Sequence, residues 1–273
     1  MSEYAPVSRS GPSAAFFDLD RTLIAGSSVF ILAAAARKMK LIPTHELLRD
    51  AGGAAMFKLF GAATDDKSDA ARDRILSFVV GQRHDDFVGL NEVVLPALLG
   101  KIRPEARRLV DLHRHAGRAT YIVSAAPKEI VEPLALALGM TGGIGTVGKV
   151  VDGVYTGELE GPFCYGDGKV VAIEELARWE RFDLSQCYAY SDSKSDLPML
   201  AAVGHPVAVN PDNQLERHAR VHGWPIVIFS QRTKTVIRRT ATGLASAGLA
   251  AGGFTAGLHL GTRRANRRPA IWR

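Results

Sequence analysis

The chain has 273 residues, of which 47% are hydrophobic and 23% charged, a composition typical of a folded protein and not of a disordered one. This length allows one main domain and a small insertion. The formal net charge is +6, but eight Lys and Arg residues lie in residues 233–273, which contain no Asp or Glu. The remaining 26 basic residues face 28 acidic ones, so residues 1–232 have a net charge of −2, which argues against a nucleic-acid-binding core.

The cysteine count and the N-terminus bear on localisation. Cys164 and Cys187 are too few for a disulfide framework, and we interpret them as structural thiols in a reducing compartment. Residues 1–13 are rich in Ser, Pro and Gly and are predicted to be a flexible lead-in. They lack the apolar stretch of a secretory signal, so we expect a cytoplasmic protein.

Short apolar runs alternate with helix-like segments along the chain. The runs read as buried strands are residues 14–18, 119–124, 187–191, 206–210 and 225–229, and the predicted helices are 105–116, 128–139, 168–180, 195–203 and 212–221. This alternation predicts an α/β fold, a doubly wound (Rossmann-like), mostly parallel sheet built from residues 14–25 and 101–232.

Two further segments interrupt this pattern. Residues 26–100 favour helix and are far longer than an ordinary βα connection of about 2–6 residues, so they are predicted to be a helical cap inserted after the first strand. Residues 142–161 combine turn signals with β-branched residues, and Asp152-Gly153 occupies the place of a hairpin turn. A β-hairpin is predicted there.

Residues 233–273 form a basic, Gly- and Ala-rich tail. Residues 240–262 carry no formal charge and contain the spacing GxxxGxxxG, which suits a membrane-associated helix. Few large apolar residues are present, which favours a weakly ordered or amphipathic tail instead. In the membrane-associated alternative, the basic flanks would face anionic lipid on the cytoplasmic side.

Two acidic residues follow the first predicted strand directly. Alternation along an extended segment places Asp18 and Asp20 on the same side. Two carboxylates this close repel each other unless a cation or a shared proton compensates, and a hard divalent ion such as Mg²⁺ is the obvious cation. Taken alone, the pattern DxDxT is also compatible with a solvated turn.

Polar residues also stand at the ends of other predicted elements. Ser124 closes the second strand, Lys169 begins the helix 168–180, and Asp192 follows the run 187–191, with Asp196 four residues further on. Each alone could be a helix cap or a surface residue. Together they place a hydroxyl, an ammonium and further carboxylates at neighbouring strand ends, where open α/β sheets bind ligands.

With these motifs the chain resembles the haloacid dehalogenase-like (HAD) phosphatases, subfamily IB, and in particular the group similar to phosphoserine phosphatase. Residues 18–22 match the first motif of that family, Ser124 the second, Lys169 the third and residues 191–196 the fourth. The four motifs occur in the family's order, and the match extends over residues 14–229.

The resemblance implies a Mg²⁺-dependent phosphomonoester hydrolase that acts on a small organic phosphate through an aspartyl-phosphate. Asp18 would be the nucleophile, and Asp20 would protonate the leaving alkoxide and later deprotonate the attacking water. Ser124 and Lys169 would stabilise the charge on the transferring phosphoryl oxygens.

The resemblance also implies a metal site. Mg²⁺ would be held by the carboxylate of Asp18, the backbone carbonyl of Asp20 and Asp192. Asp196 would orient Lys169 or the water molecules around the metal.

Two positions depart from the family pattern. Ser191 precedes Asp192 where the family usually has Gly, which should leave the metal ligand in place. Ser27 stands where phosphoserine phosphatases similar to this chain carry a Glu that receives the substrate ammonium. Phosphoserine is therefore a doubtful substrate, unless another acid of the predicted cap, such as Glu46, substitutes.

Two alternative functions remain at this point. The basic tail and Ser27 are compatible with a phosphatase of a lipid-derived head group at the membrane. A non-catalytic phosphate-binding module is the other alternative, and the complete set of motif residues argues against it.

Other patterns are not interpreted as sites. Residues 143–148 satisfy GxGxxG, but they follow a predicted helix and open the predicted hairpin, the wrong context for binding a nucleotide. His113 and His115 are expected on the solvated face of a helix.

Overall fold

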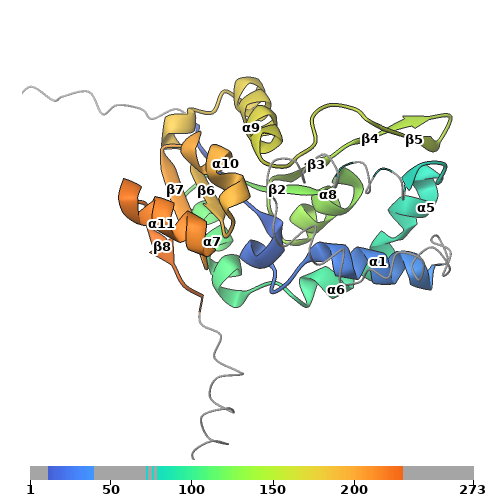
Figure 1. Ribbon diagram of the computed structural model, residues 1–273, viewed down its shortest axis with the longest axis horizontal. Coiled ribbons are helices and arrows are strands. Elements are labelled where there is room, and N and C mark those ends of the chain that lie inside the picture. Colours follow the sequence, from blue (N-terminus) through green and yellow to red (C-terminus); the bar gives the residue numbers. More distant parts are fainter. Residues whose placement is uncertain (1–11, 40–71, 73–75, 77–78, 230–273) are drawn as a thin grey trace, which may run out of the picture. The chain divides into compact units, whose positions relative to one another are not determined.

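The computed structural model describes residues 12–39, 72, 76 and 79–229 (Figure 1). Residues 40–71 of the predicted cap, with Glu46, and the tail with its segment 240–262 lie outside the described residues. The helices and strands below all belong to the first of two compact units, Met1–Ile228. Within the described ranges, no helix has both the length and the apolar character needed to cross a membrane.

The central sheet of the described region has six parallel strands in the order β3-β2-β1-β6-β7-β8 (Figure 1). Their bounds are β1 Ala14–Phe17, β2 Ala119–Pro127, β3 Gly142–Thr146, β6 Tyr188–Ser191, β7 His205–Val209 and β8 Ile226–Val227. The chain proceeds outward from β1 to β3 on one side and from β6 to β8 on the other, so the connections change direction at β1. The predicted doubly wound α/β fold is confirmed.

The helices that follow these strands agree closely with the predicted segments. Their bounds are α7 Pro104–His115, α8 Lys128–Ala137, α9 Asp167–Glu180, α10 Leu197–Ala201 and α11 Asn213–His222. The described part of the insertion contributes α1 Ser28–Lys38, α5 His84–Gly89 and α6 Asn91–Leu99, and α1 packs against α6. The division into cap and core domains itself remains a prediction.

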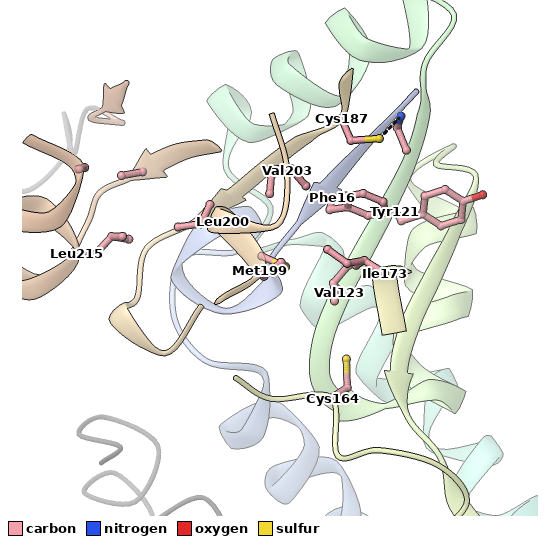
Figure 2. Close-up of a cluster of buried hydrophobic side chains, with 14 residues drawn as sticks. Phe16, Tyr121, Val123, Cys164, Ile173, Cys187, Met199, Leu200, Val203 and Leu215 are labelled. Atoms are coloured by element: carbon pink, nitrogen blue, oxygen red, sulfur yellow. Dashed lines mark hydrogen bonds between the residues drawn. The ribbon is translucent and has the colours of Figure 1, made fainter. Parts of the chain in front are cut away.

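The central strand β1 is buried on both faces because its side chains alternate. Phe16 points into a cluster that includes Ile173 of α9 and Met199 of α10 (Figure 2). Phe17 points to the opposite face, where its ring stacks on Tyr190 with a centroid distance of 4.6 Å. Each buried Phe contributes about 1.5–3 kcal/mol to folding, so β1 is held from both sides.

Both cysteines are buried free thiols, in agreement with the structural role predicted for them. The sulfur of Cys187 accepts a hydrogen bond from the backbone N–H of Ala14 at 3.3 Å, at the start of β1 (Figure 2). Cys164 belongs to the same cluster as Phe16.

The predicted hairpin is confirmed for β4 Gly148–Val151 and β5 Val154–Leu159, which turn at Asp152-Gly153. The φ angles there are 50° and 76°, positive as a type I′ turn requires.

The hairpin prediction was wrong for residues 142–146, which form the edge strand β3. A Cβ on Gly143 or Gly145 would lie 2.7 Å from the backbone of α8, so these glycines allow the strand and the helix to approach closely. The GxGxxG pattern therefore serves packing, and no helix follows it.

Backbone bonds join the described part of the insertion to the rest of the chain at its two ends and at the segment before α5. Where it leaves and returns, Ile24 and Ile102 form an antiparallel bridge. Further along, the hairpin is bonded to the segment before α5. The N–H of Gly81 donates to the carbonyl of Tyr155 at 2.9 Å, and the N–H of His84 donates to that of Gly153 at 2.9 Å.

His113 of α7 is buried, and the expectation of a solvated position was wrong for it. Its Nδ1 accepts a hydrogen bond from Nε of Arg118 at 2.7 Å, so the neutral ring carries its proton on Nε2, which lies 2.7 Å from the hydroxyl of Tyr190. Burial, followed by the charge of Arg118, lowers the pKa of His113 to about 4. His115 is exposed, as expected.

The buried His113 makes the stability of the fold depend on pH. Its pKa is lower in the folded state than in the unfolded state, so the unfolded state binds a proton more readily. The resulting stabilisation is complete above about pH 6.5 and is lost as the pH falls towards 4, by up to about 3 kcal/mol. We expect the difference in unfolding free energy between pH 7.5 and pH 4.5, measured with urea, to be smaller in H113Q than in the wild type. H115Q, altered on the exposed side of the same helix, should keep the wild-type difference, and an equal difference in H113Q would refute this account.

Candidate active site

Asp18 lies at the carboxyl end of β1, the strand where the connections change direction. Its backbone is still extended, and its N–H donates to the carbonyl of Tyr190 in β6 at 2.9 Å. Side-chain alternation places Asp18 on the same face as Phe16, the face that α9 covers. Its exposed fraction is 8%.

The amine of Lys169 reaches Asp18 because α9 buries one stripe against the sheet. Lys169, Ile173 and Ala177 follow one another at four-residue intervals and are the buried residues of this helix. Ile173 packs in the cluster around Phe16, so Lys169, one turn earlier, lies at the edge of the sheet where β1 ends. Its Nζ donates to Oδ1 of Asp18 at 2.6 Å and to Oδ2 of Asp196 at 2.8 Å.

The charged groups at this site shift one another's pKa values. Burial alone would lower the pKa of Lys169, but Asp18 and Asp196 outweigh it and raise that pKa above its ordinary value. Burial raises the pKa of Asp18, the ammonium of Lys169 opposes the shift, and the negative charges of Asp196 and Asp192 add to it. Lys169 is therefore a permanent cation among carboxylates that crowd each other.

Ser191 explains one of the departures from the family pattern. It is fully buried at the end of β6, and its hydroxyl donates to Oδ2 of Asp196 at 2.7 Å, the same oxygen that Lys169 contacts. The hydroxyl helps to fix Asp196, a contact that glycine at this position does not provide.

Asp192 is buried and paired with a residue that the sequence did not single out. Nε of Arg21 lies 2.8 Å from Oδ2 of Asp192. Burial raises the pKa of Asp192 to about 7, and the charge of Arg21 opposes that shift. Arg21 has a φ of 60°, a left-handed conformation that the sequence around it gives no signal for.

Asp20 turns away from this group and towards the insertion. Its carboxylate accepts hydrogen bonds from the N–H of Ser28 at 2.7 Å and from the hydroxyl of Ser27 at 3.1 Å, at the N-terminus of α1. Burial raises the pKa of Asp20, whereas these hydrogen bonds lower it. Ser27 is thus a partner of Asp20.

Ser124 lies at the same edge of the sheet. Phe17 pairs with Ile122, the last pair between β1 and β2. Asp18 follows this pair directly, and Ser124 lies two residues past it in β2, which continues to Pro127. Within the described residues, Ser124 is buried and accepts a hydrogen bond from the N–H of Ala126 at 3.2 Å, and it makes no hydrogen bond to the other predicted site residues.

The oxygen donors at this edge fit a hard divalent cation. In the described residues, no three His, Cys, Asp or Glu side chains are arranged to hold one ion. The predicted ligands need only two side-chain carboxylates, those of Asp18 and Asp192, together with the main-chain carbonyl of Asp20. The negative charge of Asp192 raises the pKa of Asp18, so a cation between them would relieve their repulsion.

The structure therefore brings Asp18, Lys169 and Asp196 into direct contact. Asp192 acts on Asp18 through its charge and is bonded to Arg21. Asp20 and Ser124 stand beside this group, each with a different hydrogen-bond partner.

Comparison with known proteins identifies the family. A family model described as haloacid dehalogenase-like hydrolase matches residues 15–201. A probable phosphatase of Mycobacterium tuberculosis is 41% identical over 223 residues, covering 80% of this chain and 76% of the relative. A phosphoserine phosphatase of the same organism is 36% identical over 256 residues, covering 93% and 82%.

The fold also matches a solved structure, a phospho-aspartyl intermediate analogue of phosphoserine phosphatase. The TM-score is 0.56 at 18% identity, with 84% of this chain and 98% of the other covered. The resemblance inferred from the four motifs is confirmed. The chain belongs to the haloacid dehalogenase-like hydrolase family.

Proposed function

We propose that this HAD-family phosphatase hydrolyses a small organic phosphomonoester in a Mg²⁺-dependent reaction through an aspartyl-phosphate on Asp18. The observation that carries the proposal is the buried ammonium of Lys169, held between Asp18 and Asp196 at the carboxyl end of the central strand. A carboxylate fixed beside a permanent cation is suited to attack a phosphoryl group whose charge the same cation stabilises.

Each residue has a proposed task. One oxygen of Asp18 attacks phosphorus, while the bond from Lys169 to Oδ1 fixes the direction of the carboxylate. Lys169 and Ser124 stabilise the phosphoryl oxygens, and Asp196 holds Lys169 in place. When bound, Mg²⁺ would neutralise charge on the transferred group, held by Asp18, Asp192 and the carbonyl of Asp20.

Asp20 is proposed as the general acid and then the general base. Its hydrogen bonds to Ser27 and Ser28 favour the ionised carboxylate, whereas burial favours the neutral acid. These opposed effects suit a group that must give up a proton in one step and accept one in the next.

Ser27 also bears on the substrate. Its hydroxyl donates its proton to Asp20, and this position offers no carboxylate to a substrate ammonium. We therefore propose a phosphomonoester whose recognition does not depend on an amine at this point. The segment 26–100 is proposed to act as a cap that excludes water and selects the organic part of the substrate.

The described residues bear on only one of the two alternative functions. The lipid head-group alternative depends on residues 233–273, outside the described part of the chain, and it stays a prediction, as does cytoplasmic localisation. The contact between Lys169 and Asp18 supports turnover over a non-catalytic phosphate-binding module.

The proposal can be tested at the nucleophile. We expect D18N to lower hydrolysis of p-nitrophenyl phosphate in Mg²⁺ by about a thousandfold or more, because the amide cannot form the acyl phosphate. D152N makes the same change at the hairpin turn, where Asn tolerates a positive φ, and should leave turnover unchanged. Turnover by a folded D18N at the level of D152N would end the proposal.

The role of Ser27 can be tested separately. S27A removes one of the two hydrogen bonds from the insertion to Asp20, and we expect kcat to fall by about tenfold with KM little changed. Because that bond lowers the pKa of Asp20, its loss should move the basic limb of the pH profile to higher pH. S27T should restore both values. S185A, which removes a hydroxyl bonded to Asp183, is the matched control. An unchanged pH profile in S27A would exclude this role.

The substrate class can be examined with a panel of phosphorylated metabolites that includes phosphoserine and glycerophosphates. We expect kcat/KM for glycerophosphates to equal or exceed that for phosphoserine, since Ser27 supplies no charge for an ammonium. A clear preference for phosphoserine would contradict this expectation and would direct attention to acids in residues 40–71.

A further inference from the structure

The buried carboxylate of Asp192 has a counter-ion in the structure, Arg21. The side chain of Asp192 is 7% exposed, and Nε of Arg21 lies 2.8 Å from its Oδ2. The amine of Lys169 is bonded elsewhere, to Asp18 and Asp196. Of the two predicted carboxylate ligands of the metal, Lys169 bonds Asp18, and Arg21 is the cation in direct contact with the other, Asp192.

Arg21 is built into the loop that carries the nucleophile. It lies between Asp20 and Thr22 in a left-handed conformation with a φ of 60°, which costs about 1–2 kcal/mol in a non-glycine residue. The turn is held by two backbone hydrogen bonds, from the N–H of Arg21 to the carbonyl of Gly26 at 2.9 Å and from that of Ile24 to the carbonyl of Leu19 at 3.0 Å. These bonds keep the start of the side chain beside Asp192.

The two partners differ in their contact with solvent. The side chain of Arg21 is 48% exposed, so its guanidinium can leave Asp192 and remain hydrated. Asp192 cannot become hydrated in the same way, and a buried carboxylate without a partner is strongly unfavourable. The ionised carboxylate of Asp192 therefore requires a cation, whereas Arg21 does not require Asp192.

We propose that Arg21 is the counter-ion of Asp192 in the metal-free protein and that its displacement from the carboxylate sets the affinity for Mg²⁺. The inference rests on the proposed function, because it takes Asp192 as a metal ligand. Arg21 then weakens metal binding in two ways. It occupies Oδ2 of Asp192, and it adds a positive charge beside the ion that must bind there. In return, it keeps Asp192 paired while the metal is absent.

The direct test is calorimetric titration of the metal-free protein with Mg²⁺, which needs no substrate. We expect R21Q to bind Mg²⁺ about fivefold more tightly than the wild type, the equivalent of an exposed ion pair of about 1 kcal/mol. R21K keeps the charge without the guanidinium and should lie between the two. R220Q removes a guanidinium that pairs with Glu216 on the exposed face of α11 and should match the wild type.

A second readout follows from the metal-free state. In EDTA, R21Q should melt below the wild type because Asp192 has lost its counter-ion, and saturating Mg²⁺ should raise its melting temperature by more than it raises that of the wild type or of R220Q. If R21Q does not fold, R21K supplies the same comparison.

The outcomes separate the two proposals. Wild-type or weaker Mg²⁺ affinity in R21Q, with Mg²⁺ binding to the wild type intact, would overturn the role of Arg21 and leave the proposed function standing. Absence of Mg²⁺ binding to the wild-type protein would overturn both this inference and the metal site of the proposed function.

Discussion

The candidate active site depends on one buried ammonium, that of Lys169. Asp18, Asp192 and Asp196 are all buried, and carboxylates in such a place are stable only when cations accompany them. Lys169 bonds to two of them and Arg21 to the third. Removal of one member of a buried ion pair typically costs about 3–5 kcal/mol, so Lys169, the buried cation of the two, also contributes to the stability of this site.

The position of that ammonium is a consequence of packing. Ile173 is buried in the cluster around Phe16, and it fixes α9 against the same face of β1 from which Asp18 projects. Lys169 lies one helical turn before Ile173, so the packing that places Ile173 in the core also places Lys169 beside Asp18. The apolar stripe of one helix and the alternation of one strand are sufficient to bring together two residues that are 151 positions apart in the sequence.

The fold and the motif positions could be predicted because parallel strands leave a continuous apolar signal and end at a common edge. Strand β3 could not, since its glycines have no side chains to form a pattern and are explained only by the approach of α8. The contacts made by Arg21, Ser27 and His113 were not predicted, for a different reason. Their partners come from side-chain directions in the folded chain, and neither residue type nor spacing encodes a left-handed φ or a buried imidazole.

The hairpin β4–β5 has a mechanical consequence for the insertion. Its backbone is joined to residues 81–84 as a strand is joined to its neighbour, although the two segments are separated by some 70 positions in the sequence. Rigid-body rotation of α5 and α6 about the bridge between Ile24 and Ile102 would therefore move the hairpin as well. The chain before β4 and after β5 would then have to change conformation. Any movement of α5 and α6 against the sheet would therefore be resisted by residues that follow β3, as well as by the two chain segments paired at Ile24 and Ile102.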